Sequence, residues 1–349
     1  YAARDLYAIA PHFGTLAELQ SLAAACHARG IYLILDVVMN HMGDLIDSGG
    51  SGYPSFKYPG TYPLRWRNPA KRHAGFFDDL SRFHAHGNIG NFSDPELGVG
   101  ELFGLDDRAT EDPAVRAELA SAVQWLIANT DCDGFRIDTV KHVEMGFWDT
   151  WSPLVHSGAA GQGKAAFFLF GEVFDGDDAK VGSYTGTMSG GNYKLDSVLH
   201  FPMYFTATDV FAFDAPPAWI SARYGALGSY DPTSRERLVT FLDNHDVARF
   251  QSFGIANQDE SRLRAALGWL LTARGIPSVY YGTEQEFDGG GDPWNREDMW
   301  DGQWDFGPSD GDNFDLAHPL FGFTARLIAA RRHHEALRRG QVPSPADDP

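Results

Sequence analysis

The chain has 349 residues, 43% of them hydrophobic, which is enough for a large buried core in one big domain or two ordinary ones. Its 28 basic and 47 acidic side chains give a formal net charge of -19, which would repel a polyphosphate backbone, so we expect no nucleic-acid partner. No run reaches the roughly 18 apolar residues that a membrane-spanning helix needs, so we expect no membrane partner either.

The first regular elements along the chain are a helix and a buried strand. Residues 15–30 begin with a cap-like Thr15, carry Glu18 three positions later and end in Gly30, a pattern typical of a helix with a capping box and a glycine stop. Residues 31–38 then have the composition of a buried strand. From residue 42 to about 112 no period is visible, and a stretch of this length favours a small excursion domain over a loop.

Helices and strands alternate through the rest of the chain. Pro113 opens a predicted helix over 113–130, and the strand 134–137 follows it directly. The further elements that the pattern predicts are a helix 147–155, a strand 167–173, a strand 195–204 with a helix to about 213, a strand 238–243, a helix 260–273, a strand 276–281 and a last helix from about 320 to 339. Six short apolar strands that alternate with helices imply an α/β fold with parallel pairing and right-handed crossovers.

Four of these hydrophobic stretches end in acidic and other polar residues. They are ILDVVMNH (34–41), GFRIDTVKH (134–142), FLFGEVF (168–174) and LVTFLDNHD (238–246). In a parallel (β/α) barrel the carboxyl ends of the strands lie at one shared end, where catalytic groups converge. The sequence therefore predicts an active site at this end.

Two of the acids are suited to glycosidic bond cleavage, which needs a nucleophile and a proton donor about 5 to 5.5 Å apart. Asp138 shares a strand face with Arg136, whose charge would keep the carboxylate ionised. Glu172 follows an apolar strand, and partial burial raises a carboxyl pKa toward that of a general acid. Asp246 lies beside His245 in a cluster able to bond sugar hydroxyls. Each acid alone could equally be a helix cap or a surface charge, but four such strand endings together favour a site.

At these residues the chain resembles glycoside hydrolase family 13, the α-amylase family. DVVMNH, GFRIDTVKH, GEVF and FLDNHD look like the four short motifs of that family, in the same order. The resemblance implies a (β/α)8 TIM barrel, with Asp138 as nucleophile, Glu172 as acid/base and Asp246 as the carboxylate that stabilises the distorted sugar in the transition state. It also implies that three further side chains surround the same sugar ring: Arg136, His41 and His245.

Further stretches resemble fungal-type α-amylases in particular. By that resemblance, Lys141 and His142 would contact the sugar on the leaving-group side. In the loop 282–300, Asp292 and Arg296 would bind a more distant sugar, although an Asp/Arg surface pair is the alternative. Tyr1 falls on a Tyr that stacks beneath the cleaved sugar, while the Trp that follows it in the family pattern is Ala2 here.

The resemblance also implies a domain layout. Residues 1–41 and 113–340 would form the catalytic barrel, which lacks its first two strands in this sequence, and residues 42–112 would form the excursion domain after the third strand. The β-sandwich that usually follows the barrel would be absent.

A calcium ion is expected from the same resemblance. It would join the excursion domain to the barrel through Asn40, the backbone carbonyl of His142 and an Asp before the third helix. An ungapped alignment back from Pro113 puts Ala109 at the Asp position, and a small gap restores Asp106 or Asp107. Since Ca²⁺ takes about six to eight oxygen ligands, the loss of one carboxylate would weaken such a site without removing it.

The function that the resemblance implies is retaining endo-hydrolysis of internal α-1,4 bonds in starch or glycogen, through a glycosyl-enzyme. A maltodextrin-specific hydrolase or a transglycosylase would carry the same motifs. An inactive glycan-binding fragment is the alternative from another class of protein. We expect an α-glucan polysaccharide or oligosaccharide as the partner, a monomer, and secretion from the cell.

Overall fold

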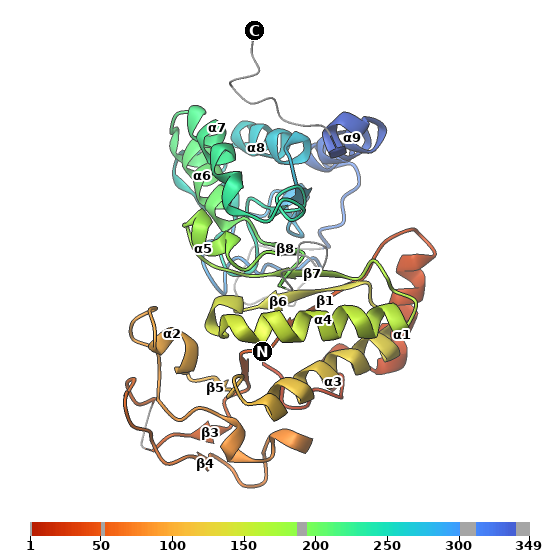
Figure 1. Ribbon diagram of the computed structural model, residues 1–349. Helices are drawn as coiled ribbons and strands as arrows, with labels where there is room; N and C mark the ends of the chain where they lie inside the picture. Colours follow the sequence, from red (N-terminus) through yellow and green to blue (C-terminus); the bar gives the residue numbers. More distant parts are fainter. Residues whose placement is uncertain (1, 50–52, 187–193, 301–311, 340–349) are drawn as a thin grey trace. The chain divides into compact units, whose positions relative to one another are not determined.

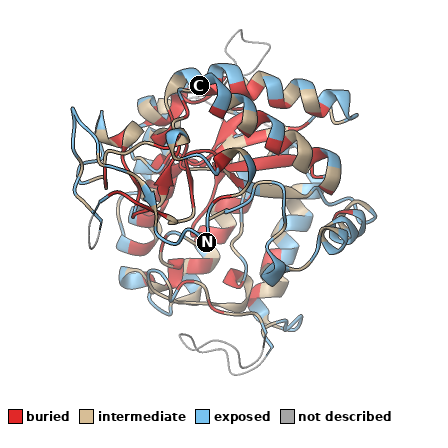
Figure 2. Cartoon of the chain, turned by 90° about the horizontal axis from the view of Figure 1, so that it is seen from below, coloured by how far each residue is buried: buried red, intermediate tan, exposed pale blue. Residues whose placement is uncertain are grey.

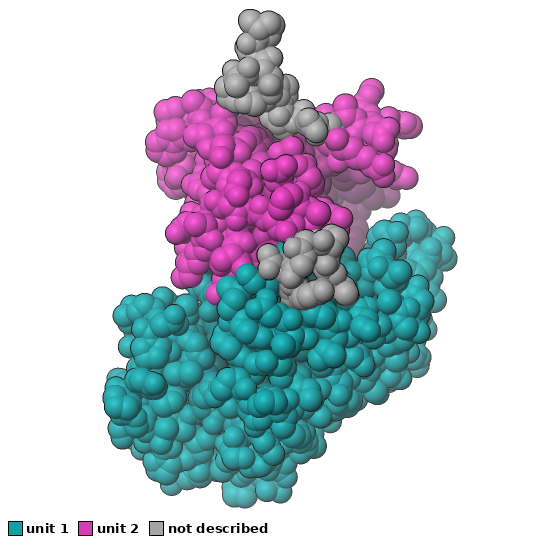
Figure 3. Space-filling model, viewed as in Figure 1, with its two compact units in different colours: residues 1–174, 186–196 teal, residues 175–185, 197–349 magenta. Residues whose placement is uncertain are grey.

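The computed structural model describes residues 2–49, 53–186, 194–300 and 312–339. The chain divides into two compact units, drawn in different colours in Figure 3. Unit 1 comprises residues 1–174 and 186–196, and unit 2 comprises residues 175–185 and 197–349. This division does not follow the predicted barrel and excursion boundaries, which stay a prediction.

Three parallel strands form the centre of unit 1 (Figure 1). They are β1 (Ile34–Val38), β6 (Gly134–Asp138) and β7 (Phe168–Gly171), with β6 in the middle. A Cβ atom at Gly134 would lie 2.3 Å from the carbonyl oxygen of Phe168, so only glycine permits this close strand approach. Since the strands run in parallel, the residues that end β6 and follow β7 lie at the same edge of the sheet.

Three long helices pack in unit 1: α1 (Leu16–His27), α3 (Pro113–Thr130) and α4 (Met145–Gly161). The capping box predicted at Thr15 and Glu18 is present, and α3 has the predicted bounds. α3 packs against both α1 and α4, and two tryptophans of α4, Trp148 and Trp151, are fully buried. Figure 2 shows helices that are buried along one side and exposed along the other, as expected for helices that cover a sheet.

The segment between β1 and α3 is irregular, as its lack of a period predicted. Its regular elements are short: β2 (His41–Met42) pairs antiparallel with β5 (Asp106–Asp107), and β3 (Ile46–Asp47) pairs antiparallel with β4 (Arg65–Trp66). One helical turn, α2 (Glu96–Val99), precedes β5. The β2–β5 pair brings the two ends of this segment together directly after β1.

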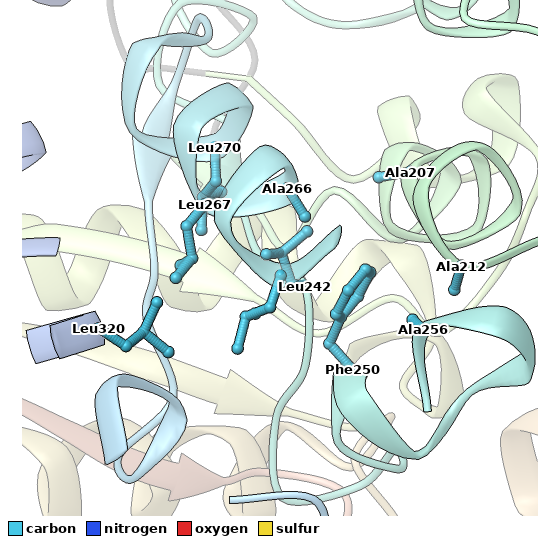
Figure 4. Close-up of a cluster of buried hydrophobic side chains, with 10 residues drawn as sticks. Ala207, Ala212, Leu242, Phe250, Ala256, Ala266, Leu267, Leu270 and Leu320 are labelled. Atoms are coloured by element: carbon cyan, nitrogen blue, oxygen red, sulfur yellow. The ribbon is translucent and has the colours of Figure 1, made fainter. Parts of the chain in front are cut away.

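Unit 2 contains the remaining parallel strands, β8 (Ser197–Val198), β9 (Val239–Thr240) and β10 (Ile276–Pro277). β9 pairs in parallel with β10, and Leu199, next to β8, forms a parallel bridge with Val239. The helices of this unit are α5 (Asp178–Gly182), α6 (Phe201–Phe213), α7 (Ala218–Gly225), α8 (Glu260–Thr272), α9 (Pro319–His333) and α10 (Glu335–Arg339). Figure 4 shows part of the core between them, where Leu267 and Leu270 of α8 lie near Leu242, Phe250 and Leu320.

The six predicted strands are all present in the described residues, but several predicted boundaries are wrong: β9 and β10 are shorter than predicted and α4 is longer. The strand expected over 195–204 ends before α6, which begins at Phe201; Pro202 lacks the N–H that a strand would use and suits the first turn of a helix. The last helix is two helices, because His334 has an extended backbone. α7 was not predicted at all. None of the described helices is both long and apolar enough to span a membrane.

Candidate active site

Arg136 is the centre of a charged cluster in unit 1. Its Nη1 donates to Oδ1 of Asp138 at 2.6 Å, and its Nη2 lies 3.1 Å from Oε2 of Glu172. Nη1 also donates to Oδ1 of Asp36, 3.0 Å away, since Asp36 on β1 lies opposite Arg136 in the strand register. Only 9% of Arg136 is exposed, so one buried cation holds the two predicted catalytic acids side by side.

The protonation of this cluster suits acid/base chemistry. Burial alone would raise the pKa of Asp138, but the positive charge of Arg136 and its hydrogen bond outweigh burial and bring this pKa below its usual value. A side-chain hydrogen bond with Glu172 contributes to the same lowering. The charge of Arg136 therefore favours the ionised form of Asp138 that a nucleophile needs.

Backbone geometry fixes where these two acids lie. The N–H of Glu172 donates to the carbonyl of Ile137 at 2.7 Å, and the N–H of Val140 donates to the carbonyl of Glu172 at 3.0 Å, so the pairing continues past β7. The N–H of Thr139 donates to the Glu172 carboxyl at 3.1 Å. Thr139 has a left-handed backbone with φ of 49°, which turns the chain sharply away from the sheet directly after Asp138.

His41 is buried next to this cluster and is neutral. Burial lowers its pKa to about 4, against the opposing charge of Asp138, and the positive charge of Arg108 adds to the lowering. Its Nδ1 lies 3.3 Å from Nδ2 of Asn40. A neutral imidazole offers one donor and one acceptor, which suits contact with sugar hydroxyls.

Lys141 and His142 follow in the short turn after Asp138, and an aromatic ring from the excursion segment lies beside them. The ring of Phe92 is 6.1 Å from that of His142 at an interplanar angle of 82°, and Nζ of Lys141 lies 6.0 Å from the Phe92 centroid. Phe92 is 51% exposed, so an apolar face stays open next to two predicted sugar contacts. Neither Phe92 nor Asp36 was predicted: the register of β1 against β6 marks Asp36, but no sequence pattern marks Phe92.

In unit 2 the structure brings together four predicted residues. Nε2 of His245 lies 3.1 Å from Oδ2 of Asp246, and Nη2 of Arg296 lies 3.7 Å from its Oδ1. Nε of Arg296 lies 2.8 Å from Oδ1 of Asp292. Asp292 and Arg296 are therefore more than an isolated surface pair, because Arg296 also reaches Asp246.

Asn295, which sequence reasoning missed, anchors the loop of this second cluster. It is fully buried, and its Nδ2 donates to the carbonyl oxygens of His245 at 3.0 Å and Val247 at 2.7 Å. This bond network fixes the backbone on both sides of Asp246. The last predicted contact, Tyr1, lies outside the described residues.

The carboxylates expected as calcium ligands are engaged elsewhere. Asp106 accepts hydrogen bonds from the N–H of Leu45 at 2.9 Å and lies 2.6 Å from Nε2 of His73. Asp107 lies 2.7 Å from Nδ1 of His84. Among the described residues, no group of three or more His, Cys, Asp or Glu side chains could hold a metal ion.

The backbone at Asn40, another expected calcium donor, is bound by an arginine. The carbonyl oxygen of Asn40 accepts a hydrogen bond from the N–H of Arg108 at 2.9 Å. Burial lowers the pKa of Arg108 to about 9, so a cation lies at this junction at neutral pH. The two engaged carboxylates and this cation do not fit a calcium ion at the junction, and no step of the proposed chemistry uses this ion.

Known proteins resemble this chain over most of its length. The family profile described as "Alpha amylase, catalytic domain" matches residues 1–304. The chain is 36% identical to "Beta/alpha-amylase" of Paenibacillus polymyxa over 97% of its own length and 25% of that protein. It is 32% identical to "Alpha-amylase 1" of Lipomyces kononenkoae, over 86% of its length and 43% of that protein. A cyclomaltodextrin glucanotransferase of Bacillus licheniformis is 28% identical over 98% of this chain and 43% of that protein.

Solved structures show the same relationship. The α-amylase of Geobacillus thermoleovorans, solved in complex with acarbose, superimposes with a TM-score of 0.74 at 31% identity, over 97% of this chain and 66% of that one. The family match and this neighbour imply a (β/α)8 barrel, whereas the predicted lack of its first two strands stays a prediction. The chain spans less than half the length of the two curated amylases above. It belongs to the α-amylase catalytic-domain family, glycoside hydrolase family 13.

Proposed function

We propose that this chain is the catalytic domain of a glycoside hydrolase that cleaves internal α-1,4 bonds of starch- or glycogen-type glucans with retention of configuration. The observation that carries the proposal is the cluster around Arg136, which lies 2.6 Å from Asp138 and 3.1 Å from Glu172 and lowers the pKa of Asp138. A retaining mechanism needs a carboxylate nucleophile next to a carboxylic acid that donates a proton.

In the first proposed step, the Asp138 carboxylate attacks the anomeric carbon while Glu172 gives its proton to the departing glycosidic oxygen. The C–O bond of the glucan breaks, and a glycosyl ester forms on Asp138. In the second step, the Glu172 carboxylate takes a proton from water, whose oxygen attacks the anomeric carbon and releases Asp138. Glu172 is thereby protonated again, so the cycle closes. Proton transfer of this kind contributes a rate enhancement of about 10²- to 10⁴-fold.

Arg136 has a separate role in this proposal. It stays positively charged throughout, because its three acidic neighbours, Asp36, Glu172 and Asp138, more than offset its burial and raise its pKa. It therefore keeps Asp138 ionised before attack, and a bound sugar replaces the direct bond between the two acids. Asp246 with His245, and the neutral His41, are proposed to bind hydroxyls of the distorted sugar.

The direct test is substitution of either acid in the protein that carries this chain. Asp138→Asn and Glu172→Gln are isosteric and should each abolish the release of reducing ends from soluble starch. Arg29→Gln serves as the control and should keep wild-type activity, because Arg29 is exposed and precedes β1, at the opposite edge of the sheet from Asp138. Near wild-type activity in either acid variant would refute the assignment.

A transglycosylase is the second candidate, favoured by the similarity to a cyclomaltodextrin glucanotransferase. An acceptor sugar must then compete with water for the glycosyl-enzyme, and the open face of Phe92 offers such a sugar a stacking surface. Product analysis on starch and on short maltodextrins separates the two candidates. Linear products alone support hydrolysis, whereas cyclic or elongated glucans support transfer. Secretion and a monomeric state stay predictions from the family.

A further inference from the structure

Arg108, directly after β5, is the most deeply buried charged side chain near the predicted calcium position. It is 1% exposed. Its Nη1 donates to the carbonyl oxygen of Val38 at 2.8 Å and to that of Met39 at 2.9 Å. Its own N–H donates to the carbonyl oxygen of Asn40 at 2.9 Å. Three consecutive carbonyl groups at the end of β1 are thus bound by one residue of the excursion segment.

The surroundings of the guanidinium are shaped for a cation. The ring of Phe77, which is buried, lies with its centroid 5.1 Å from the central guanidinium carbon. Carbonyl oxygens and an aromatic face both stabilise positive charge. No hydrogen-bond partner within the described part of the chain reaches Nε or Nη2, so this junction presents positive donors where a metal ion would need acceptors.

Arg108 also fixes the backbone that leads to His41, a predicted sugar contact. Val38, Met39 and Asn40 immediately precede His41, and His41 pairs with Asp107 in the β2–β5 ladder. Asp107 in turn is next to Arg108. Arg108 therefore joins the end of β1 to the end of the excursion segment at the place where His41 enters the site.

We propose that Arg108 takes the place of a metal ion at this junction, so that the catalytic domain holds its excursion segment and His41 in position without calcium. A hard divalent ion binds carbonyl and carboxylate oxygens, and here the carbonyl oxygens are bound by a guanidinium fixed in the chain. The carboxylates Asp106 and Asp107 are left to bind histidines instead. Arg108 is a positioning residue, since it acts through the backbone before His41.

The test compares thermal unfolding in EDTA and in calcium. The wild-type protein should unfold at the same temperature in both, and calorimetric titration with CaCl₂ should give no binding heat. Arg108→Met removes the charge and both carbonyl contacts at similar volume, and should lower the Tm by at least about 4 °C, with no recovery in calcium. Arg108→Lys keeps a charged donor and should recover part of that loss.

Three outcomes would overturn the proposal: a wild-type Tm that falls in EDTA and returns with calcium, stoichiometric calcium binding by the wild type, or an unchanged Tm in Arg108→Met. If Arg108→Met does not fold, the two wild-type measurements still decide the question. None of these readouts uses glucan hydrolysis, so the result stands whether or not the proposed activity is found.

Discussion

At the scale of single residues, one buried arginine sets the chemistry of this site. Arg136 is bonded to Asp138, Glu172 and Asp36, and its charge favours the ionised form of Asp138 beside the second predicted acid. Asp138 and Glu172 could be predicted from the sequence because each follows a short apolar strand. Asp36 could not, since its contact with Arg136 depends on the register between two strands that are about 100 residues apart in the chain.

Arg136 should determine the pH below which kcat/KM falls. The pKa of Asp138 is lowered in the folded protein, so its ionised form is retained above the ordinary Asp value of about 3.9 and is lost only as the pH falls further. We therefore expect the acid limb of kcat/KM to lie below about pH 3.9. In Arg136→Met the limb should move up by about 1 to 3 pH units.

Arg136→Lys is the matched control, because it keeps the charge and loses only the geometry. Its acid limb should move less than that of Arg136→Met. If the limb is the same in the wild type and in Arg136→Met, then Arg136 does not control the ionisation of the nucleophile.

Phe92 provides a second prediction at this scale. Its open face lies beside Lys141 and His142, so Phe92→Ala should raise KM for maltodextrins several-fold, with stacking worth about 1 kcal/mol. Phe13→Ala is the control, since Phe13 is 84% exposed and belongs to no predicted contact. Equal KM values for the wild type and Phe92→Ala would remove Phe92 from the site.

At the scale of elements, regular helices could be predicted well and the irregular segment could not. α3 has the predicted bounds because Pro113 starts it and its apolar residues follow a helical period. The contacts of Arg108 and Phe92 were not predictable, because residues 42–112 show no period from which a side-chain direction could be read. A local sequence pattern indicates which face of a helix or strand is buried. The contacts of residues 42–112 instead depend on parts of the chain that are distant in sequence.

The burial of the aromatic side chains of α4 should be a main source of stability in unit 1. Trp148 is fully buried in edge-to-face contact with both Phe147 and Trp151. Trp148→Ala should lower the free energy of unfolding by about 3 to 5 kcal/mol, measured by denaturant titration. Leu154→Ala on the same helix should cost less than about 1 kcal/mol, because Leu154 is 46% exposed. Equal losses would show that α4 is not packed as described.

At the scale of the whole molecule, the order of strands and helices and the four motifs together predicted the family. The family profile and the relatives at 36% and 32% identity confirm it. The predicted domain boundaries stay a prediction; the compact units separate at residue 174 and place Asp246 in the second unit. Sequence motifs identify which strand ends carry the acids, but they do not carry the long-range packing that defines a compact unit.

The central claim is that Asp138 forms a covalent glycosyl ester, and mass spectrometry tests it most directly. The protein is incubated with a fluorinated maltosyl fluoride, which slows breakdown of the ester, and is then digested and sequenced by fragmentation. We predict one added maltosyl mass on the peptide that contains Asp138, at Asp138 itself. A label on Glu172 or Asp246, or consumption of the reagent with no labelled peptide at any time, would contradict the account.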